Sequence, residues 1–282
     1  MFSSFMTNAW IVGSIVAAAA GFIGFFVVVR GAPFAAHALP LGAFPGAAGA
    51  ALLGINPLLG ICAFSALGVI GIVQLARRGR HEVATALSLV MLLGMGALFL
   101  SMISDYSQKV FSLLFGQVLG ISAADVMPVA IISAIAVAVT AILFRPLLLS
   151  SVAPELGEAR GVSRERMEFW FLSIVALTTA VALPVVGALL VFSLMVGPAS
   201  AARSLTNRPI LAALLSLAIS VVVVWAAIAL SYVSDWPIGF FVGGFGALGY
   251  LVGRVRASDA APTSQPAASY SGFPLTAQGK PL

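Results

Sequence analysis

Apolar residues in this chain come in long unbroken runs, and short segments with glycine, proline or charged residues separate one run from the next. A helix needs roughly 20 apolar residues to cross the hydrocarbon core of a bilayer. Runs near that length occupy 8–29, 34–55, 57–76, 83–104, 126–148, 168–184, 186–202, 209–232 and 237–254. The pattern predicts about nine transmembrane helices, within a range of about eight to ten.

The composition points to the same fold class. Hydrophobic residues make up 61% of the chain and charged residues only 8%, whereas soluble domains carry about 25% charged residues. Only helices and closed barrels satisfy their own backbone hydrogen bonds in lipid. The sequence lacks the alternating segments of a barrel. We therefore predict an all-α polytopic membrane protein, with the lipid bilayer as its surroundings.

Two stretches depart from the simple pattern of one run and one helix. The apolar stretch 168–203 is too long for one span, and Pro184 near its middle removes a helix hydrogen bond. This favours two spans joined by a tight turn. The segment 108–121 is too short to cross, which is typical of a re-entrant or interfacial helix.

The basic residues indicate the orientation, because they accumulate in cytoplasmic loops. With nine spans and an outside N-terminus, every arginine falls on the cytoplasmic side: Arg30, Arg77, Arg78, Arg80, Arg145, Arg160, Arg164, Arg166, Arg203, Arg208, Arg254 and Arg256. Topology thus explains the net charge of +5. A nucleic-acid partner is not expected, because no soluble basic face exists.

The two ends of the chain differ in character. No basic region precedes the first apolar run and no small-residue cleavage site follows it, so we expect the first span to be retained. From about residue 257 the sequence turns to Ala, Pro, Ser, Thr, Gln and Gly, which is typical of disorder. We predict a transmembrane domain over 1–256 and a disordered cytoplasmic tail over 257–282.

Ionisable residues inside a span usually mark function, and here they are few. No carboxylate lies in the middle of a predicted span, which argues against a carrier driven by a buried Asp or Glu. His37 lies early in the second span, and neutral imidazole is the commonest protein metal ligand. His37 is therefore the candidate metal ligand or pathway residue; the alternative is a hydrogen-bonded interfacial histidine.

Pro40 and Pro198 interrupt predicted spans. Broken helices in membranes are tolerated where they line a cavity or pack on neighbours. We assign both prolines to a translocation pathway, although simple packing explains each of them equally well.

The longest loop, 149–167, contains a predicted short helix. Pro154 suits a first helical position, Glu155 and Glu158 follow it, and Gly161 suits the stop after Arg160. An exposed helix of mixed charge is a natural docking surface for a soluble partner. The alternative is a simple amphipathic connector.

Three ordered segments resemble the permease subunits of ABC-type zinc/manganese uptake systems, and with their spacing the resemblance covers about 8–254. They are GFFVVVR at 24–30, LLFGQVLGIS at 113–122, and a third stretch that starts at Arg145 and ends with VVGALLVFSLMVGPASAAR at 185–203. The resemblance implies a multi-pass protein of the bacterial plasma membrane that moves zinc or manganese and binds no cofactor of its own.

The resemblance also implies partners: a second permease copy, cytoplasmic ATP-binding subunits and an extracytoplasmic substrate-binding protein. The 149–167 loop is similar to the family's coupling helix, which seats in a groove of the ATP-binding subunit. That reading assigns Pro154, Glu155, Glu158, Arg160 and Gly161 to ATPase coupling. The chain itself is not expected to be an enzyme, because it has no phosphate-binding lysine loop.

One departure from the family pattern affects the cargo. The family commonly shows Asp-Ala-Leu-Ser-His in the second span, where this chain has His37-Ala-Leu-Pro40-Leu41, and the often acidic position after Phe-Gly is Gln117. The implied pathway residues are thus His37, Pro40, Gln117 and Pro198, with His37 the metal contact. Two alternatives stay open: the same machine carrying a metal chelate, and a non-transporting membrane scaffold for an ATPase.

Overall fold

The computed structural model describes residues 4–76, 81–103, 116 and 121–259, and within these ranges it contains helices and no strands. The first helices are α1 (Ser4–Val29), α2 (Pro33–Leu53), α3 (Pro57–Ala76) and α4 (His81–Ser101). The middle of the chain forms α6 (Ala123–Ile142), α7 (Phe144–Val152), α8 (Pro154–Ala159) and α9 (Arg164–Val186). The last are α10 (Ala188–Leu205), α11 (Pro209–Ser234) and α12 (Ile238–Asp259).

The described helices bear out an all-α membrane fold. Seven of them, α1, α2, α3, α4, α6, α9 and α11, are long and apolar enough to cross a bilayer. Shorter apolar helical segments, Leu190–Leu205 and Ile238–Leu251, lie where the other two spans were predicted. The count of about nine spans is therefore not confirmed. The predicted short helix at 108–121, apart from Gly116 and Ile121, lies outside the described residues, as does most of the predicted tail.

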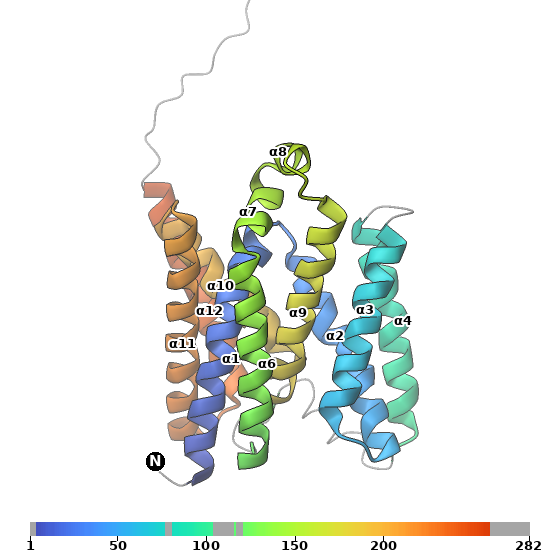
Figure 1. The fold of residues 1–282 in the computed structure, drawn as a ribbon. Coiled ribbons are helices and arrows are strands. Elements are labelled where there is room, and N and C mark those ends of the chain that lie inside the picture. The colour runs from blue at the N-terminus through green and yellow to red at the C-terminus, as the bar shows by residue number, and fades with distance from the viewer. Residues whose placement is uncertain (1–3, 77–80, 104–115, 117–120, 260–282) are drawn as a thin grey trace, which may run out of the picture.

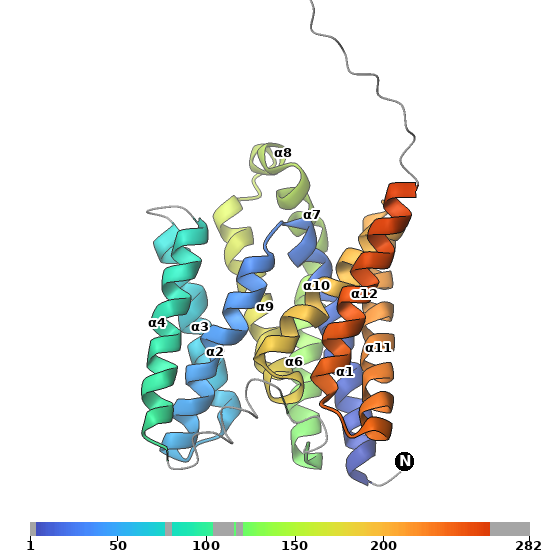
Figure 2. The same cartoon turned by 180° about the vertical axis from the view of Figure 1, so that it is seen from behind.

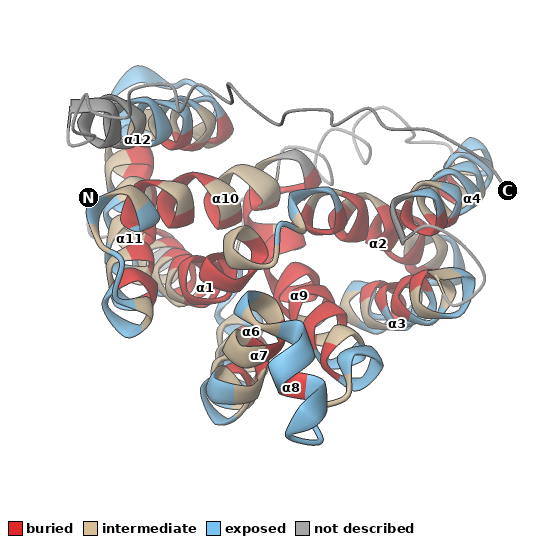
Figure 3. Cartoon of the chain, turned by 90° about the horizontal axis from the view of Figure 1, so that it is seen from above, coloured by how far each residue is buried: buried red, intermediate tan, exposed pale blue. Residues whose placement is uncertain are grey.

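The long helices run up and down in alternation, and α8 stands at one end of the bundle (Figures 1 and 2). The first turn of α1 lies at the opposite end, and α12 finishes at the same end as α8. Seen from above, α2, α3 and α4 form one group, and α1, α10, α11 and α12 form another (Figure 3). Contacts of α2 with α10 join the two groups directly, and α9 contacts both α3 and α1.

The core lies on the axis of the bundle. Of an 18-residue apolar stretch of α9, 72% is buried inside the bundle. Only 22% of the corresponding stretch of α6 is buried. The outward helices present apolar side chains, as expected where lipid replaces water. Phe25, Phe26 and Phe171 are among the largest fully buried side chains. The inner helices therefore form a fixed frame for any site between them.

Two chain breaks differ from the predictions. The break between the sixth and seventh predicted spans lies at Gly187, whose φ of 87° suits glycine, while Pro184 stays inside α9. The predicted single span 126–148 is divided at Leu143 into α6 and α7. Pro146 explains the division, because it has no N–H to donate to the carbonyl of Ile142.

Candidate translocation pathway and coupling surface

His37 lies where α2 meets α10. Its half-buried ring packs edge-on against Phe192 of α10, with the ring centroids 5.2 Å apart and the planes at 77°. The Nδ1 atom of His37 is buried and has no hydrogen-bond partner among the described residues. A buried polar atom without a partner is costly and calls for an explanation such as an ion or water. This nitrogen is therefore a candidate ligand atom.

Pro40 and Pro198 lie inside helices that pack against each other. Pro40 is buried in α2 and Pro198 is buried in α10, and both helices continue through them. Neither proline breaks its helix, so the prediction of broken helices is wrong at these positions. Each still removes one backbone donor, which leaves the carbonyl four residues earlier without its usual helical partner. Gln117 lies outside the described residues, although its neighbour Gly116 contacts the α9–α10 junction.

The described residues contain no group of three or more His, Cys, Asp or Glu side chains that could hold a metal ion. His37 supplies one good metal ligand, its ring nitrogen. A metal ion at this point would need further ligands from backbone carbonyls, from water or from a second copy of the chain. The geometry thus suits a site that an ion passes through more than a closed structural metal centre.

The predicted short helix is present as α8. Pro154 occupies its first turn, Arg160 follows its last residue, and Gly161 adopts a φ of 79°. The amides of Gly161 and Val162 close the end by donating to the carbonyls of Glu158 and Gly157.

The predicted coupling residues are all accessible. Pro154, Glu155, Glu158, Arg160 and Gly161 are exposed, whereas Gly157 is buried close to α7. Most of α8 is therefore exposed, and the helix lies at the edge of the bundle seen from above (Figure 3).

Arg30, a marker of the predicted topology and the last residue of segment 24–30, makes contacts that the sequence did not predict. One nitrogen donates to Glu168 Oε2 of α9 at 2.7 Å, and another donates to the Ser150 hydroxyl of α7 at 2.9 Å. The guanidinium carbon also lies 4.9 Å from the centre of the Phe171 ring. The Arg30 side chain is only 7% exposed. Arg30 therefore ties the turn before α2 to the two segments that flank α8.

A polar pocket of about 300 Å³ adjoins this network. Its lining includes Arg30, Thr85, Pro154 and Glu168, so it touches the α1–α2 turn, α4, the start of α8 and α9. The pocket therefore lies beside both the Arg30–Glu168 ion pair and the start of α8.

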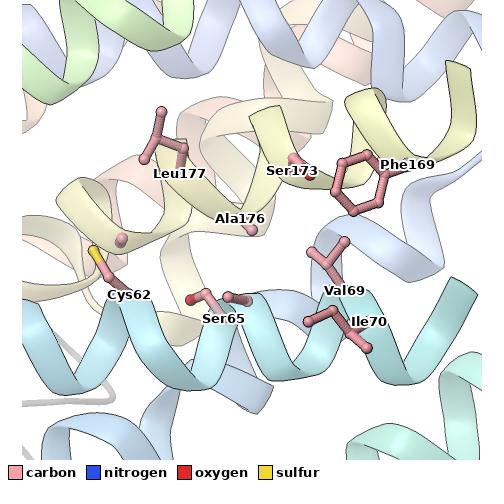
Figure 4. Close-up of a pocket in the computed structure, with 10 residues that line it drawn as sticks. Cys62, Ser65, Val69, Ile70, Phe169, Ser173, Ala176 and Leu177 are labelled. Carbon is pink, nitrogen blue, oxygen red and sulfur yellow. The ribbon is translucent and has the colours of Figure 1, made fainter. Parts of the chain in front are cut away.

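A second cavity, of about 180 Å³, separates α3 from α9 (Figure 4). Cys62 and Ser65 of α3 face Ser173 and Ala176 of α9 across it. The Ser65 hydroxyl is buried and has no hydrogen-bond partner among the described residues. Most of the remaining lining of this cavity is apolar, including Val69, Ile70 and Leu177. Sequence reasoning missed it, because small residues at helical spacing carry no distinctive signal.

The bundle of apolar helices, the unpaired imidazole between two of them and the projecting charged helix define a membrane transport subunit of the permease class. The comparisons give the particular family. The model of the ABC 3 transport family matches residues 2–253, and the chain belongs to that family.

The relatives include named transport proteins. The chain is 29% identical over 207 residues to the manganese transport system membrane protein MntC of Listeria monocytogenes, covering 73% of this chain and 74% of that protein. It is 28% identical over 189 residues to the high-affinity zinc uptake system membrane protein ZnuB of Haemophilus influenzae, covering 66% and 72%.

Two solved structures share the fold. A chain of PsaBC from Streptococcus pneumoniae in complex with Fab superimposes with a TM-score of 0.81 at 22% identity, covering 89% of this chain and 91% of that one. An inward-facing putative metal-chelate type ABC transporter gives 0.70 at 14% identity, covering 89% and 85%. Both confirm the helical arrangement.

Proposed function

We propose that this chain is the membrane-spanning subunit of an ATP-driven importer of divalent transition-metal ions. The family match over residues 2–253 carries the proposal, because named relatives serve manganese and zinc transport. ATP hydrolysis resides in a separate cytoplasmic subunit that docks on α8. An extracytoplasmic binding protein delivers the ion to the opposite end, and two copies of the chain pair to enclose the path.

In this proposal the chain crosses the bilayer nine times. The shorter segments in α10 and α12 support this count, because they lie where the seventh and ninth spans were predicted. The N-terminus is outside and the C-terminus is cytoplasmic. The ends of helices that bear Arg30, Arg145, Arg164 and Arg208 lie together with α8, which agrees with the preference of basic residues for the cytoplasm.

The path of coupling runs from α8 to His37. Movement of α8 on ATP binding shifts α7 and the start of α9, which flank it in the chain. Arg30 contacts both of these segments and is followed by α2, which begins three residues later and carries His37. A shift at α8 can therefore reorient α2 against α10 and open the ion path toward the cytoplasm.

A second cargo is favoured by one specific observation. The Asp–His pair typical of the family is replaced by His37 and Leu41, and the described residues contain no cluster of metal ligands. A bare divalent ion would meet little compensation for its hydration shell here. A metal chelate, which brings its own ligands, is therefore the alternative cargo. A scaffold that binds an ATPase without transport is the remaining alternative.

Cellular metal content distinguishes these functions. Manganese, zinc and iron are measured under metal limitation in cells with the chain, in cells without it, and in cells with a partner ATPase unable to hydrolyse ATP. A selective fall in manganese or zinc in the last two strains supports free-ion import. A change that depends on an added chelator favours the chelate, and no change in any metal contradicts metal transport.

A further inference from the structure

An apolar groove of about 550 Å³ lies near the end of the bundle where α11 begins. Ile142 and Leu148 form the wall on the α6–α7 side, and Ile210 and Leu214 form the wall on α11. Phe22 of α1 also lines it. The chain bends at Leu143, between α6 and α7, beside this space. No pathway residue lines the groove, so its role is separate from the proposed ion path.

One charged residue, Arg145, lines this apolar groove. Arg145 is exposed and its side chain has no ion-pair or hydrogen-bond partner in the part of the chain that the structure describes. Its neighbour Phe144 is anchored by the Phe25 and Phe26 rings, whose centroids lie 6.0 and 5.0 Å away. Arg208, also exposed, caps α11 directly before the lining residue Pro209. One cation therefore lines the apolar space, and a second precedes one of its lining residues in the chain.

We propose that this groove binds an anionic phospholipid, with an acyl chain against the apolar walls and the phosphate held by Arg145. A guanidinium pairs with phosphate oxygens through two parallel hydrogen bonds. The N-terminal end of the α11 dipole adds positive potential. Basic pockets between transmembrane helices on the cytoplasmic side are suited to anionic headgroups. In a zwitterionic lipid the ammonium offsets the phosphate charge, so the two arginines favour the anionic lipid.

Native mass spectrometry of the full chain, purified with its ATP-binding subunit, tests the site. The complex is titrated with dioleoyl-phosphatidylglycerol or with dioleoyl-phosphatidylcholine, which share their acyl chains. The wild-type complex should retain more of the anionic lipid. Arg145→Gln should lower that retention about fivefold, the value of one basic residue beside an anionic headgroup. Arg203→Gln, which changes an exposed arginine on α10 that does not line the groove, should leave it unchanged.

A second variant tests the apolar part of the site. Ala141 is exposed and lines the groove, so Ala141→Trp should fill it and lower retention of both lipids without loss of the ATP-binding subunit. Equal retention of the two lipids by wild type overturns the proposal, as does an equal loss from Arg145→Gln and Arg203→Gln. If Ala141→Trp alters the oligomeric state and leaves lipid retention unchanged, the groove is an interface between copies and the proposal is wrong.

Discussion

At the residue scale, we expect cargo recognition in the proposed pathway to depend on His37. His37→Ala should reduce the initial rate of zinc uptake by at least about tenfold and manganese uptake by less, because imidazole binds zinc more strongly than manganese. Uptake of each radioactive ion by cells expressing the variant measures this. Ser65→Ala serves as the control, because it also removes a buried polar group that has no described partner.

Wild-type uptake of both metals by His37→Ala would make the histidine structural. Equal losses with Ser65→Ala would show that any buried polar group matters in the same way. Either result would remove imidazole from the ion path and strengthen the chelate alternative.

Close helix packing gives a second prediction at this scale. A Cβ atom on Gly46 of α2 would lie in severe overlap with the backbone of Gly60 on α3, whereas a Cβ on Gly94 of α4 meets nothing within 4 Å. Gly46→Ala should therefore destabilise the protein by about 2 kcal/mol or more. Gly94→Ala should stabilise it by about 0.5 kcal/mol or more through helix propensity.

Thermal unfolding in mild detergent, followed by tryptophan fluorescence, compares the two variants directly. The melting temperature should fall for Gly46→Ala and stay level or rise for Gly94→Ala. Equal melting temperatures would show that α2 and α3 do not pack through these glycines.

At the scale of elements, the Arg30–Glu168 pair joins the segments around α8. Arg30→Gln removes the guanidinium that pairs with the Glu168 carboxylate, which is 22% exposed. Breaking a buried ion pair costs about 3 kcal/mol. Transport-stimulated ATPase activity should fall more than basal activity, because the link from α8 to α2 is weakened while α8 itself is intact. Both activities are measured on the reconstituted complex.

The double variant Arg30→Gln with Glu168→Gln distinguishes two effects. One is the removal of a single charge from the ion pair, and the other is the loss of the contact between these two positions. It should recover most of the stability, since both members of the ion pair are then neutral, but not the stimulated activity. Full recovery of both would show that the pair has only a structural role.

The turn after α8 gives a matched test of ATPase docking. Gly161 and Gly54 both have positive φ, 79° and 67°, and a Cβ at either meets nothing within 4 Å. Gly161→Val and Gly54→Val should therefore cost the same strain, about 1–2 kcal/mol. Only Gly161→Val should reduce the amount of ATP-binding subunit that copurifies with the chain. A similar reduction by both variants would argue against α8 as the docking surface.

The elements themselves show what a sequence can reveal. Long apolar runs predicted α3, α4 and α11 within a few residues, because lipid imposes a length on each span. The helix at Pro154 was predictable because its start, its acids and its glycine stop are local signals. The break between the sixth and seventh spans was predicted at Pro184 but lies at Gly187. Glycine adopts the positive φ of this turn without the steric cost that other residues have.

Contacts between residues that are far apart in the chain could not be predicted from the sequence. Arg30 and Glu168 are separated by 138 positions, and each looked like an ordinary charge at the end of a span. The contact between His37 and Phe192 depends on how α2 meets α10, which no local pattern specifies. The helices were thus predictable, and the contacts that join them were not.

At the scale of the whole molecule, the topology is open to direct measurement. In a Cys62→Ala background, Ile55→Cys places a thiol between α2 and α3, and Asn207→Cys places one between α10 and α11; both positions are exposed. A membrane-impermeant maleimide should label Ile55→Cys in intact spheroplasts and Asn207→Cys only after permeabilisation. The opposite pattern would reverse the proposed orientation, and labelling of both from outside would contradict the span count.

ATP-driven ion uptake is the central claim, and reconstitution tests it most directly. The chain, its ATP-binding subunit and its binding protein are placed in proteoliposomes with the ATP-binding face accessible, and movement of radioactive manganese and zinc is followed with ATP or with a non-hydrolysable analogue. The account predicts that at least one ion moves only with hydrolysable ATP and only with the binding protein present. ATP hydrolysis without movement of either ion, free or chelated, would contradict it.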